Sequence, residues 1–370
     1  MTKLPFADPR AGFLAARTEL VAAFETVLES GHYVLGEQVE GFEREWAARC
    51  RTEHAIGVSS GTDALALALR AVGVGPGDEV LVPAMTAVAT WMAVSQIGAV
   101  PVGVDIEPLR NGMDPAGVQA RLSSRTRALV AVHLFGHPAD IVSLAQLAAE
   151  ANIPLIEDAA QAHGTHLDGQ PAGSLGALAA FSFYPTKNLA AMGDAGAVMT
   201  SDPELADRVR LLREYGWRTR ADAELKGVNA RLDELQAALL RVMLRRLPAT
   251  IERRRVIARA YLDGLADVPG LELPAPTADS EPAWHLFVVR HSRRDALAAG
   301  LARAGIGTGV HYATVPPLNT AFAAAGWTPG AFPVAERHAA NALSLPIYPE
   351  ISDVDVSRIV DAVHSVAKRI

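Results

Sequence analysis

The chain has 370 residues, of which 50% are hydrophobic and 20% charged, with 34 Lys+Arg against 41 Asp+Glu and a formal net charge of -7. This apolar content excludes an intrinsically disordered chain, and the negative charge balance argues against binding bulk nucleic acid or an anionic membrane through net positive charge. The single cysteine, Cys50, excludes an intramolecular disulfide and a cysteine-rich zinc site, and it fits a reducing compartment.

The first residues, MTKLPFADPR at 1–10, lack the apolar core of a signal peptide. No uncharged apolar run reaches the roughly 18 residues that a spanning helix needs. The histidines are scattered, without the spacing of a helical metal-binding pair, so we expect no metal site. These features predict a cytoplasmic protein that has neither a membrane nor a nucleic acid as its partner.

Short apolar runs alternate with longer amphipathic runs along most of the chain. The runs typical of strands are His54–Val58, Glu79–Pro83, Val100–Asp105, Ala128–Leu134, Ile153–Glu157, Ala179–Tyr184 and Ala195–Thr200. Stretches typical of helices, such as Asp63–Val72 and Ile141–Ala151, lie between them. The alternation predicts an α/β fold with a mostly parallel sheet covered on both faces, and ligands of such sheets bind at the carboxyl ends of the strands.

The pattern changes near residue 230. Arg231–Arg246 is typical of one long helix, Pro248 follows it, and a further strand is expected at Trp284–Arg290. We therefore place a domain boundary near residue 245, within or just after this helix. Residues 1–245 would form a large domain that includes an N-terminal arm, and residues 246–370 a smaller α+β domain.

A turn of small residues, Ser59 to Asp63, follows the first predicted strand and opens a helix. Small residues let backbone N–H groups approach an anion, and the helix dipole favours a phosphate at this position. The same residues also suit an ordinary helix cap. The turn alone leaves both interpretations open.

Two later strand ends carry reactive side chains. Asp158 follows one predicted strand, with His163 shortly after it, and Lys187 follows another. An acid can hold the proton on a cofactor ring nitrogen and so make the ring an electron sink, and a lysine can form a Schiff base with an aldehyde. Each residue has an ordinary structural alternative, as a helix cap, a packed histidine or a loop lysine. Together with the phosphate-type turn, they are the parts that pyridoxal phosphate requires.

Several motifs resemble those of the DegT/DnrJ/EryC1/StrS sugar aminotransferases, within the fold-type I pyridoxal-phosphate enzymes. The resemblance runs nearly end to end. It is carried by SGTDAL at 60–65, EDAAQAHG at 157–164, FSFYPTKN at 181–188, KGVNARLDELQAALLRV at 226–242, GVHY at 309–312 and FPVAERHAANALSLPIYPE at 332–350. It implies pyridoxal 5'-phosphate as the cofactor, and a large domain with a mostly parallel sheet beside a smaller C-terminal domain.

The resemblance also implies individual roles in the catalytic site. Lys187 would be the imine lysine that moves the proton, and Asp158 the partner of the pyridinium nitrogen. The remaining cofactor-binding groups would be Gln161 beside the ring hydroxyl, and the backbone of Gly61 and Thr62 with the hydroxyl of Ser182 at the phosphate.

Four further positions match motifs for the partner subunit and the sugar. Asn229 resembles a residue that reaches the phosphate in the partner's site, which implies an obligate homodimer with shared active sites. Tyr184, His311 and Tyr312 match residues that line the sugar pocket. The alternatives are a surface helix cap for Asn229 and a packed strand end for His311 and Tyr312.

The implied activity is transfer of an amino group from L-glutamate to a keto group, at C-3, of a dTDP-linked keto-6-deoxyhexose. A C-4 acceptor or a carbocyclic ketone is the alternative acceptor. A lyase of the same fold is a weaker alternative, because such relatives can replace the lysine with histidine and this chain keeps Lys187. A cofactor-binding regulatory protein without catalysis is weaker still.

Two segments depart from the family pattern. Pro83-Ala-Met-Thr86 is followed by Ala87, where relatives usually carry an aromatic residue stacked on the cofactor ring. Trp91, four residues on, could take over the stacking or could simply belong to the core. Trp217 and Ala221 depart in a segment that bears on the choice of acceptor.

Overall fold

The computed structural model describes residues 3–370 and is built around a seven-stranded sheet with the order β1-β9-β8-β5-β4-β2-β3. The strands are β1 (His54–Val58), β2 (Glu79–Pro83), β3 (Val100–Val104), β4 (Thr126–Val132), β5 (Leu155–Asp158), β8 (Leu178–Ser182) and β9 (Gly196–Thr200). β9 is antiparallel to both of its neighbours, and the other pairs are parallel. The seven predicted strands are confirmed, with small shifts at their ends.

Helices cover both faces of this sheet. In β4, Val130 and Val132 pack into one core, whereas Leu129 and Ala131 pack into another on the opposite face. Strands buried on both sides read as continuous apolar runs, which is why the pattern predicted the sheet. One face packs against α4 (Gly61–Ala71), α5 (Val88–Gln96) and α8 (Pro203–Arg213), and the other against α3 (Glu37–Cys50), α6 (Pro115–Arg121), α7 (Ile141–Glu150) and α9 (Glu234–Gly264).

The long helix α9 differs from its prediction. It begins after Asp233, three residues later than predicted, and runs through Pro248 to Gly264. A proline inside a helix removes one backbone hydrogen bond, but Leu247 and Ile251 on either side of Pro248 are buried in the core, and their packing holds the helix together there. Residue 245 lies inside α9, which runs without a break through the predicted boundary. The division into domains 1–245 and 246–370 stays a proposal.

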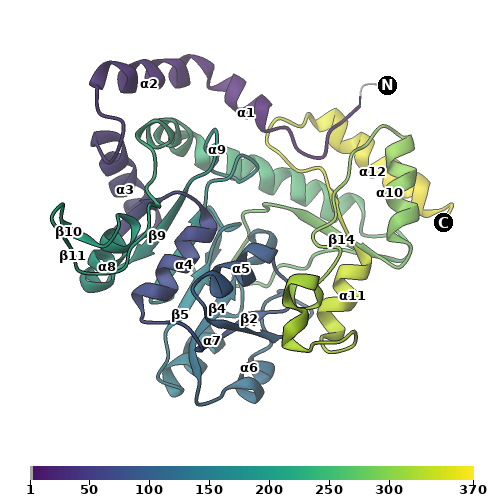
Figure 1. The fold of residues 1–370 in the computed structure, drawn as a ribbon. Coiled ribbons are helices and arrows are strands. Elements are labelled where there is room, and N and C mark those ends of the chain that lie inside the picture. Colours follow the sequence, from purple (N-terminus) through teal and green to yellow (C-terminus); the bar gives the residue numbers. More distant parts are fainter. Residues whose placement is uncertain (1–2) are drawn as a thin grey trace.

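The C-terminal part has its own small sheet and core. Its strands follow the order β12-β14-β15, and the strand predicted at Trp284–Arg290 begins three residues later than expected. The elements are β12 (Leu271–Glu272), β14 (Phe287–His291), β15 (Ala342–Leu345), α10 (Arg294–Arg303), α11 (Pro333–Asn341) and α12 (Asp353–Ala367), with short 3-10 turns at Pro316–Leu318 and Thr320–Ala325. Figure 1 shows α9 running from the large sheet toward this region.

The N-terminal segment connects the two parts. Leu4 forms a bridge with Ile306 and belongs to the C-terminal core, and α1 (Pro9–Ala15) and α2 (Arg17–Ser30) then pass along α9 toward α3. The remaining short elements are β6 (His166–Leu167), β7 (Gln170–Pro171), β13 (Ser280–Glu281), β10 (Trp217–Thr219), β11 (Asp222–Ala223) and a 3-10 turn at Leu134–Gly136. This path brings the start of the chain close to the strand ends of the large sheet.

Candidate active site

Three strand ends of the large sheet meet at one edge. β1, β8 and β5 all point the same way, because β1 and β8 are each antiparallel to β9, and β8 is parallel to β5. The edge therefore brings together the α4 start after β1, Asp158 at the end of β5 and Ser182 at the end of β8. Parallel sheets bind ligands at such an edge.

The start of α4 has the shape of an anion cradle. The Ser60 hydroxyl accepts from the Asp63 N–H at 3.1 Å, and among the described residues the N–H groups of Gly61 and Thr62 have no acceptor. A Cβ atom added to Gly61 would lie 2.5 Å from the Cβ of Ser182, so glycine is required for this close approach. Two unpaired N–H groups at a helix N-terminus, with the Ser182 hydroxyl facing them, fit a phosphate.

Asp158 is held by a chain of hydroxyl groups. Thr90 Oγ1 lies 2.8 Å from Asp158 Oδ2 and 2.8 Å from Thr86 Oγ1, and all three side chains are buried. An ionised carboxylate only accepts, so Thr90 donates to Asp158 and Thr86 donates to Thr90. The Ala160 N–H donates to the other oxygen at 3.1 Å. The carboxylate is thus fixed at the strand end, where it can face a ring nitrogen.

Gln161 links the sheet edge to the C-terminal part. Its Oε1 accepts from the Phe135 N–H at 2.7 Å, and its Nε2 donates to the Tyr312 hydroxyl at 3.0 Å. Burial, with the Asp158 charge adding to it, raises the pKa of Tyr312 to about 12, so the phenol keeps its proton at neutral pH. Two sequence-predicted residues therefore lie side by side.

Lys187 follows β8, in a turn where its N–H donates to the Tyr184 carbonyl at 2.8 Å. Its side chain is half-buried. Desolvation lowers the pKa of its amine to about 8, against the opposing pull of Asp158. A sizeable fraction of the amine is therefore neutral near physiological pH, as a nucleophile that attacks an aldehyde must be.

Neutral imidazoles surround Lys187. Burial, followed by the Lys187 charge, lowers the pKa of His163 to about 3 and that of His311 to about 4, and the same two causes lower the pKa of His285 well below its usual value. His311 is fixed by Ser344 Oγ at 2.8 Å from its Nδ1 and by ring stacking on Phe6 at 5.4 Å. These three imidazoles therefore add no positive charge beside Lys187 at neutral pH.

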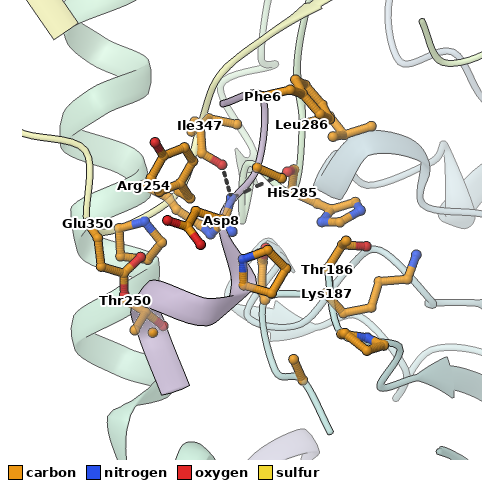
Figure 2. A pocket seen from close by; sticks show the side chains of 18 of the residues that line it. Phe6, Asp8, Thr186, Lys187, Thr250, Arg254, His285, Leu286, Ile347 and Glu350 are labelled. Atoms are coloured by element: carbon orange, nitrogen blue, oxygen red, sulfur yellow. Dashed lines mark hydrogen bonds between the residues drawn. The ribbon is translucent and has the colours of Figure 1, made fainter. Parts of the chain in front are cut away.

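A cavity of about 200 Å³ adjoins Lys187 and His311. Figure 2 shows its walls, which come from the N-terminal segment around Asp8, from α9 with Arg254, and from the segment before α12 with Glu350. Lys187 and His311 are the sequence-predicted site residues that line it, and Asp158, Gln161 and Ser182 do not.

Other sequence-predicted residues lie apart from this cluster. Asn229 is exposed before α9, and its backbone forms a bridge with Glu214. Tyr184 is 52% exposed, close to Lys187 along the chain. Neither lines the Lys187 cavity. Their predicted roles at a partner's phosphate and at the sugar stay proposals.

The hypothesis that Trp91 stacks on the cofactor ring is wrong. Its side chain is wholly buried, its indole N–H donates to the Pro83 carbonyl at 3.0 Å, and its ring packs edge-on against Phe322. A ring that is enclosed in the core presents no face to a ligand. On α5 it is Thr90, one residue earlier, that points at Asp158.

Sequence reasoning missed several residues at the site. Thr90 gave no local signal, because Thr86 precedes α5 and the four-residue spacing of a helix face does not relate the two. Arg254 and His285 gave no signal, because one lies within a run of arginines and the other within an apolar strand pattern. Phe6 and Asp8 reach the cavity through a long-range bridge that no local pattern encodes.

The fold and the site together define a pyridoxal-phosphate-dependent aminotransferase: an anion cradle, an acid at a strand end and a lysine of lowered pKa meet on one sheet edge. These residues fit pyridoxal 5'-phosphate, which this enzyme uses as its cofactor. A family model described as the DegT/DnrJ/EryC1/StrS aminotransferase family matches residues 15–364. The chain belongs to this family, as the sequence motifs predicted.

Individual relatives agree with this assignment. The chain is 49% identical over 368 residues to a dTDP-3-amino-3,4,6-trideoxy-alpha-D-glucose transaminase of Streptomyces venezuelae, covering 100% of this chain and 97% of the relative. It is similar to the crystal structure of S. venezuelae DesV in complex with a ketimine intermediate, with a TM-score of 0.98, 48% identity and full coverage of both chains. A sugar aminotransferase from Streptococcus pneumoniae in its PMP form matches with a TM-score of 0.92 and 28% identity, over 99% of this chain and 98% of the other.

None of the helices within residues 3–370 combines the length and the apolar character that crossing a membrane would require.

Proposed function

We propose that this transaminase moves an amino group from L-glutamate to the C-3 keto group of a dTDP-linked keto-6-deoxyhexose, in amino-sugar biosynthesis. The observation that carries the proposal is the cluster of Lys187, Asp158 and the Gly61–Ser182 cradle at one sheet edge. The full-length likeness to a dTDP-3-amino-3,4,6-trideoxy-alpha-D-glucose transaminase supports the assignment of the C-3 position and of the dTDP nucleotide.

We assign the cofactor-binding roles from the geometry. The N–H groups of Gly61 and Thr62, with the Ser182 hydroxyl, would hold the phosphate at the N-terminus of α4. Asp158 would hold a proton on the ring nitrogen, and Gln161 would lie beside the ring hydroxyl. When bound, pyridoxal phosphate supplies an electron sink for the reacting carbon.

Lys187 and its neighbours would supply the protein groups that transfer the proton and orient the substrate. Neutral Lys187 Nζ would bind the cofactor aldehyde and, once released, accept and return the proton that moves during transfer. His311, Tyr312 and Tyr184 would line the sugar pocket, where their fixed positions orient the acceptor. Because Gln161 donates a hydrogen bond to Tyr312, the position of the proposed sugar pocket is fixed relative to the proposed cofactor site.

We also propose a homodimer with shared sites, acting in the cytoplasm. Asn229 is exposed, as a residue that reaches into a partner's site must be. Leu14, Phe24 and Leu28 on α1 and α2 are 46–58% exposed and offer apolar surface that a second copy would cover. The buried free thiol of Cys50 is in keeping with a reducing compartment.

The substrate proposal is tested by product analysis. The purified holoenzyme is incubated with L-glutamate and a dTDP-3-keto-6-deoxyhexose, and the products are identified by NMR and mass spectrometry. A 3-amino sugar formed with an equal amount of 2-oxoglutarate supports the proposal. Amination only of a 4-keto sugar or of a carbocyclic ketone would move the assignment to those acceptors, and release of ammonia with deoxygenation would indicate a lyase.

The shared site is tested by mixing two inactive variants, Lys187→Ala and Asn229→Ala. If each site combines Lys187 of one chain with Asn229 of the other, random exchange of subunits restores about a quarter of the sites. Mixed samples that stay inactive after verified subunit exchange would contradict the shared site.

A further inference from the structure

The cavity next to Lys187 has polar groups that the cofactor-binding cluster does not use. Arg254, on α9, and His285, on the neighbouring wall, both line this cavity. Each side chain is buried, with 6% of its surface exposed. His285 Nδ1 has no hydrogen-bond partner within residues 3–370. Figure 2 shows Arg254 on the cavity wall beside Asp8 and opposite Lys187.

The guanidinium of Arg254 is only partly satisfied. Its Nη1 donates to the carbonyls of Trp284, His285 and Ile347 at 3.1, 3.3 and 2.9 Å, which fixes its orientation. Its Nε is buried without a partner, and among the described residues all hydrogen bonds of the guanidinium are made by Nη1, which leaves Nη2 without one. Among the described residues, Nε is the unpaired nitrogen of Arg254 that is cut off from solvent, and Nη2 is not cut off in this way. Because Arg254 lines the cavity, we infer that Nη2 faces it.

No carboxylate of the described residues forms an ion pair with Arg254. Burial lowers the pKa of the guanidinium to about 10, against the opposing charge of Glu350, as expected for a buried cation without an ion-pair partner. Such a charge costs free energy unless an anion pairs with it. Guanidinium groups pair best with planar carboxylates or with phosphates. The wall at Arg254 therefore calls for an anionic ligand.

Two further properties of the cavity narrow the choice. Asp8 and Glu350 line the same space, Asp8 half-buried and Glu350 exposed at the rim, so a cationic group is accommodated beside the anionic one. A volume of about 200 Å³ gives room for a small molecule. A carboxylate together with an ammonium group in that volume describes a free α-amino acid.

We propose that this cavity is the docking site of the amino donor, with a donor carboxylate on Arg254 Nη2 and the donor ammonium facing Asp8 and Glu350. The proposal rests on the proposed function, because it presumes that an amino acid must reach Lys187. His285 and Lys187 line the same cavity, so a molecule held there is adjacent to the group that it must approach.

The test separates the two halves of the reaction. Holoenzyme is mixed with L-glutamate, or in the opposite direction its aminated form with the keto sugar, and the change in cofactor absorption is followed in each case. In Arg254→Met the glutamate concentration for half-maximal rate should rise about 10- to 100-fold, because a hydrogen bond to a charged group is lost. The keto-sugar half should change by less than about twofold.

Arg253→Met is the matched control. Arg253 is the preceding residue of α9, donates to the Ile351 carbonyl at 2.6 Å and pairs with Asp353, and does not line the cavity. It should leave both halves unchanged. Equal weakening of both halves in Arg254→Met would overturn the proposal, since Arg254 would then be only a clamp on its three carbonyls. Unchanged glutamate dependence would overturn it as well.

A second measurement keeps the proposal testable if Arg254→Met does not fold. Glutarate, which has carboxylates and no amine, should inhibit the wild-type holoenzyme competitively against L-glutamate and only weakly against the keto sugar. Asp8→Asn should weaken the binding of glutamate and leave the inhibition by glutarate unchanged. Inhibition against both substrates alike, or none, would contradict the assignment. If no amino acid changes the wild-type cofactor absorption, it is the proposed transaminase function that has failed.

Discussion

Two regions meet at Lys187 and differ in how their polar groups are satisfied. On the sheet edge, the Asp158 carboxylate accepts from Thr90 and Ala160, and Gln161 is bonded at both ends of its amide. In the cavity, the Arg254 guanidinium makes its hydrogen bonds through Nη1 alone, and within residues 3–370 Nη2 has no partner. Side chains with fixed partners keep a cofactor ring oriented through every turnover, whereas a side-chain donor left open toward a cavity suits a molecule that enters and leaves.

The largest expected effect is the loss of the group that both regions share. Lys187→Ala should lower the transamination rate about 10⁴-fold or more, because the bond to the cofactor and the proton transfer are both lost. Steady-state formation of 2-oxoglutarate measures it. Activity within about tenfold of wild type would contradict the role of Lys187 in binding the cofactor and transferring the proton.

The next largest effect concerns the sheet edge. Asp158→Asn replaces the buried charge by an amide of the same size, so the proton on the ring nitrogen loses its partner. We expect a rate loss of about 10²- to 10⁴-fold, equivalent to breaking a buried charge pair. Both half-reactions should fall together when followed by cofactor absorption, in contrast to Arg254→Met. A loss confined to one half-reaction would contradict the assigned role.

The hydroxyl groups of Thr86 and Thr90 behind Asp158 are expected to support cofactor binding. Thr90→Val removes a hydrogen bond to a charged group and should weaken cofactor retention about 10- to 100-fold, whereas Thr90→Ser should retain it. Equilibrium dialysis of the cofactor measures the difference. A valine variant that binds as tightly as the serine variant would show that these hydroxyl groups do not support Asp158.

The smallest effect is a pH dependence of cofactor loading. The pKa of Lys187 is lowered to about 8, so the neutral amine increases as the pH rises toward 8 and levels off above it. The rate at which cofactor-free enzyme takes up pyridoxal phosphate should rise about tenfold per pH unit below 8 and then flatten. Stopped-flow absorption measures this rate. A rise that continues to pH 10 would indicate an unshifted lysine.

The sheet-edge region was largely predictable from sequence, because strand ends and short motifs are local. The turn at Ser59–Asp63, Asp158 and Lys187 each follow a buried strand, and parallel pairing brings them together. The prediction that Trp91 contacts the cofactor missed the correct residue of α5 by one position. Successive helical residues point about 100° apart, so Thr90 faces Asp158 and Trp91 faces the core.

The cavity region was not predictable in the same way. Its walls come from the N-terminal segment, the far half of α9 and the segment before α12, which are distant in sequence. The Leu4–Ile306 bridge that positions Asp8, and the continuation of α9 past Pro248 that positions Arg254, both depend on tertiary packing. Arg254 itself reads as one of several arginines on an amphipathic helix.

The role of Lys187 as the residue that binds the cofactor is tested by locating the cofactor on the chain. Holoenzyme is reduced with borohydride, digested and analysed by mass spectrometry, with a second sample treated with L-glutamate before reduction. We expect a pyridoxyl group on Lys187 in the first sample and its absence in the second, with 2-oxoglutarate released in equal amount. A modification on another lysine, or a Lys187 adduct that persists in the presence of glutamate without 2-oxoglutarate, would contradict it.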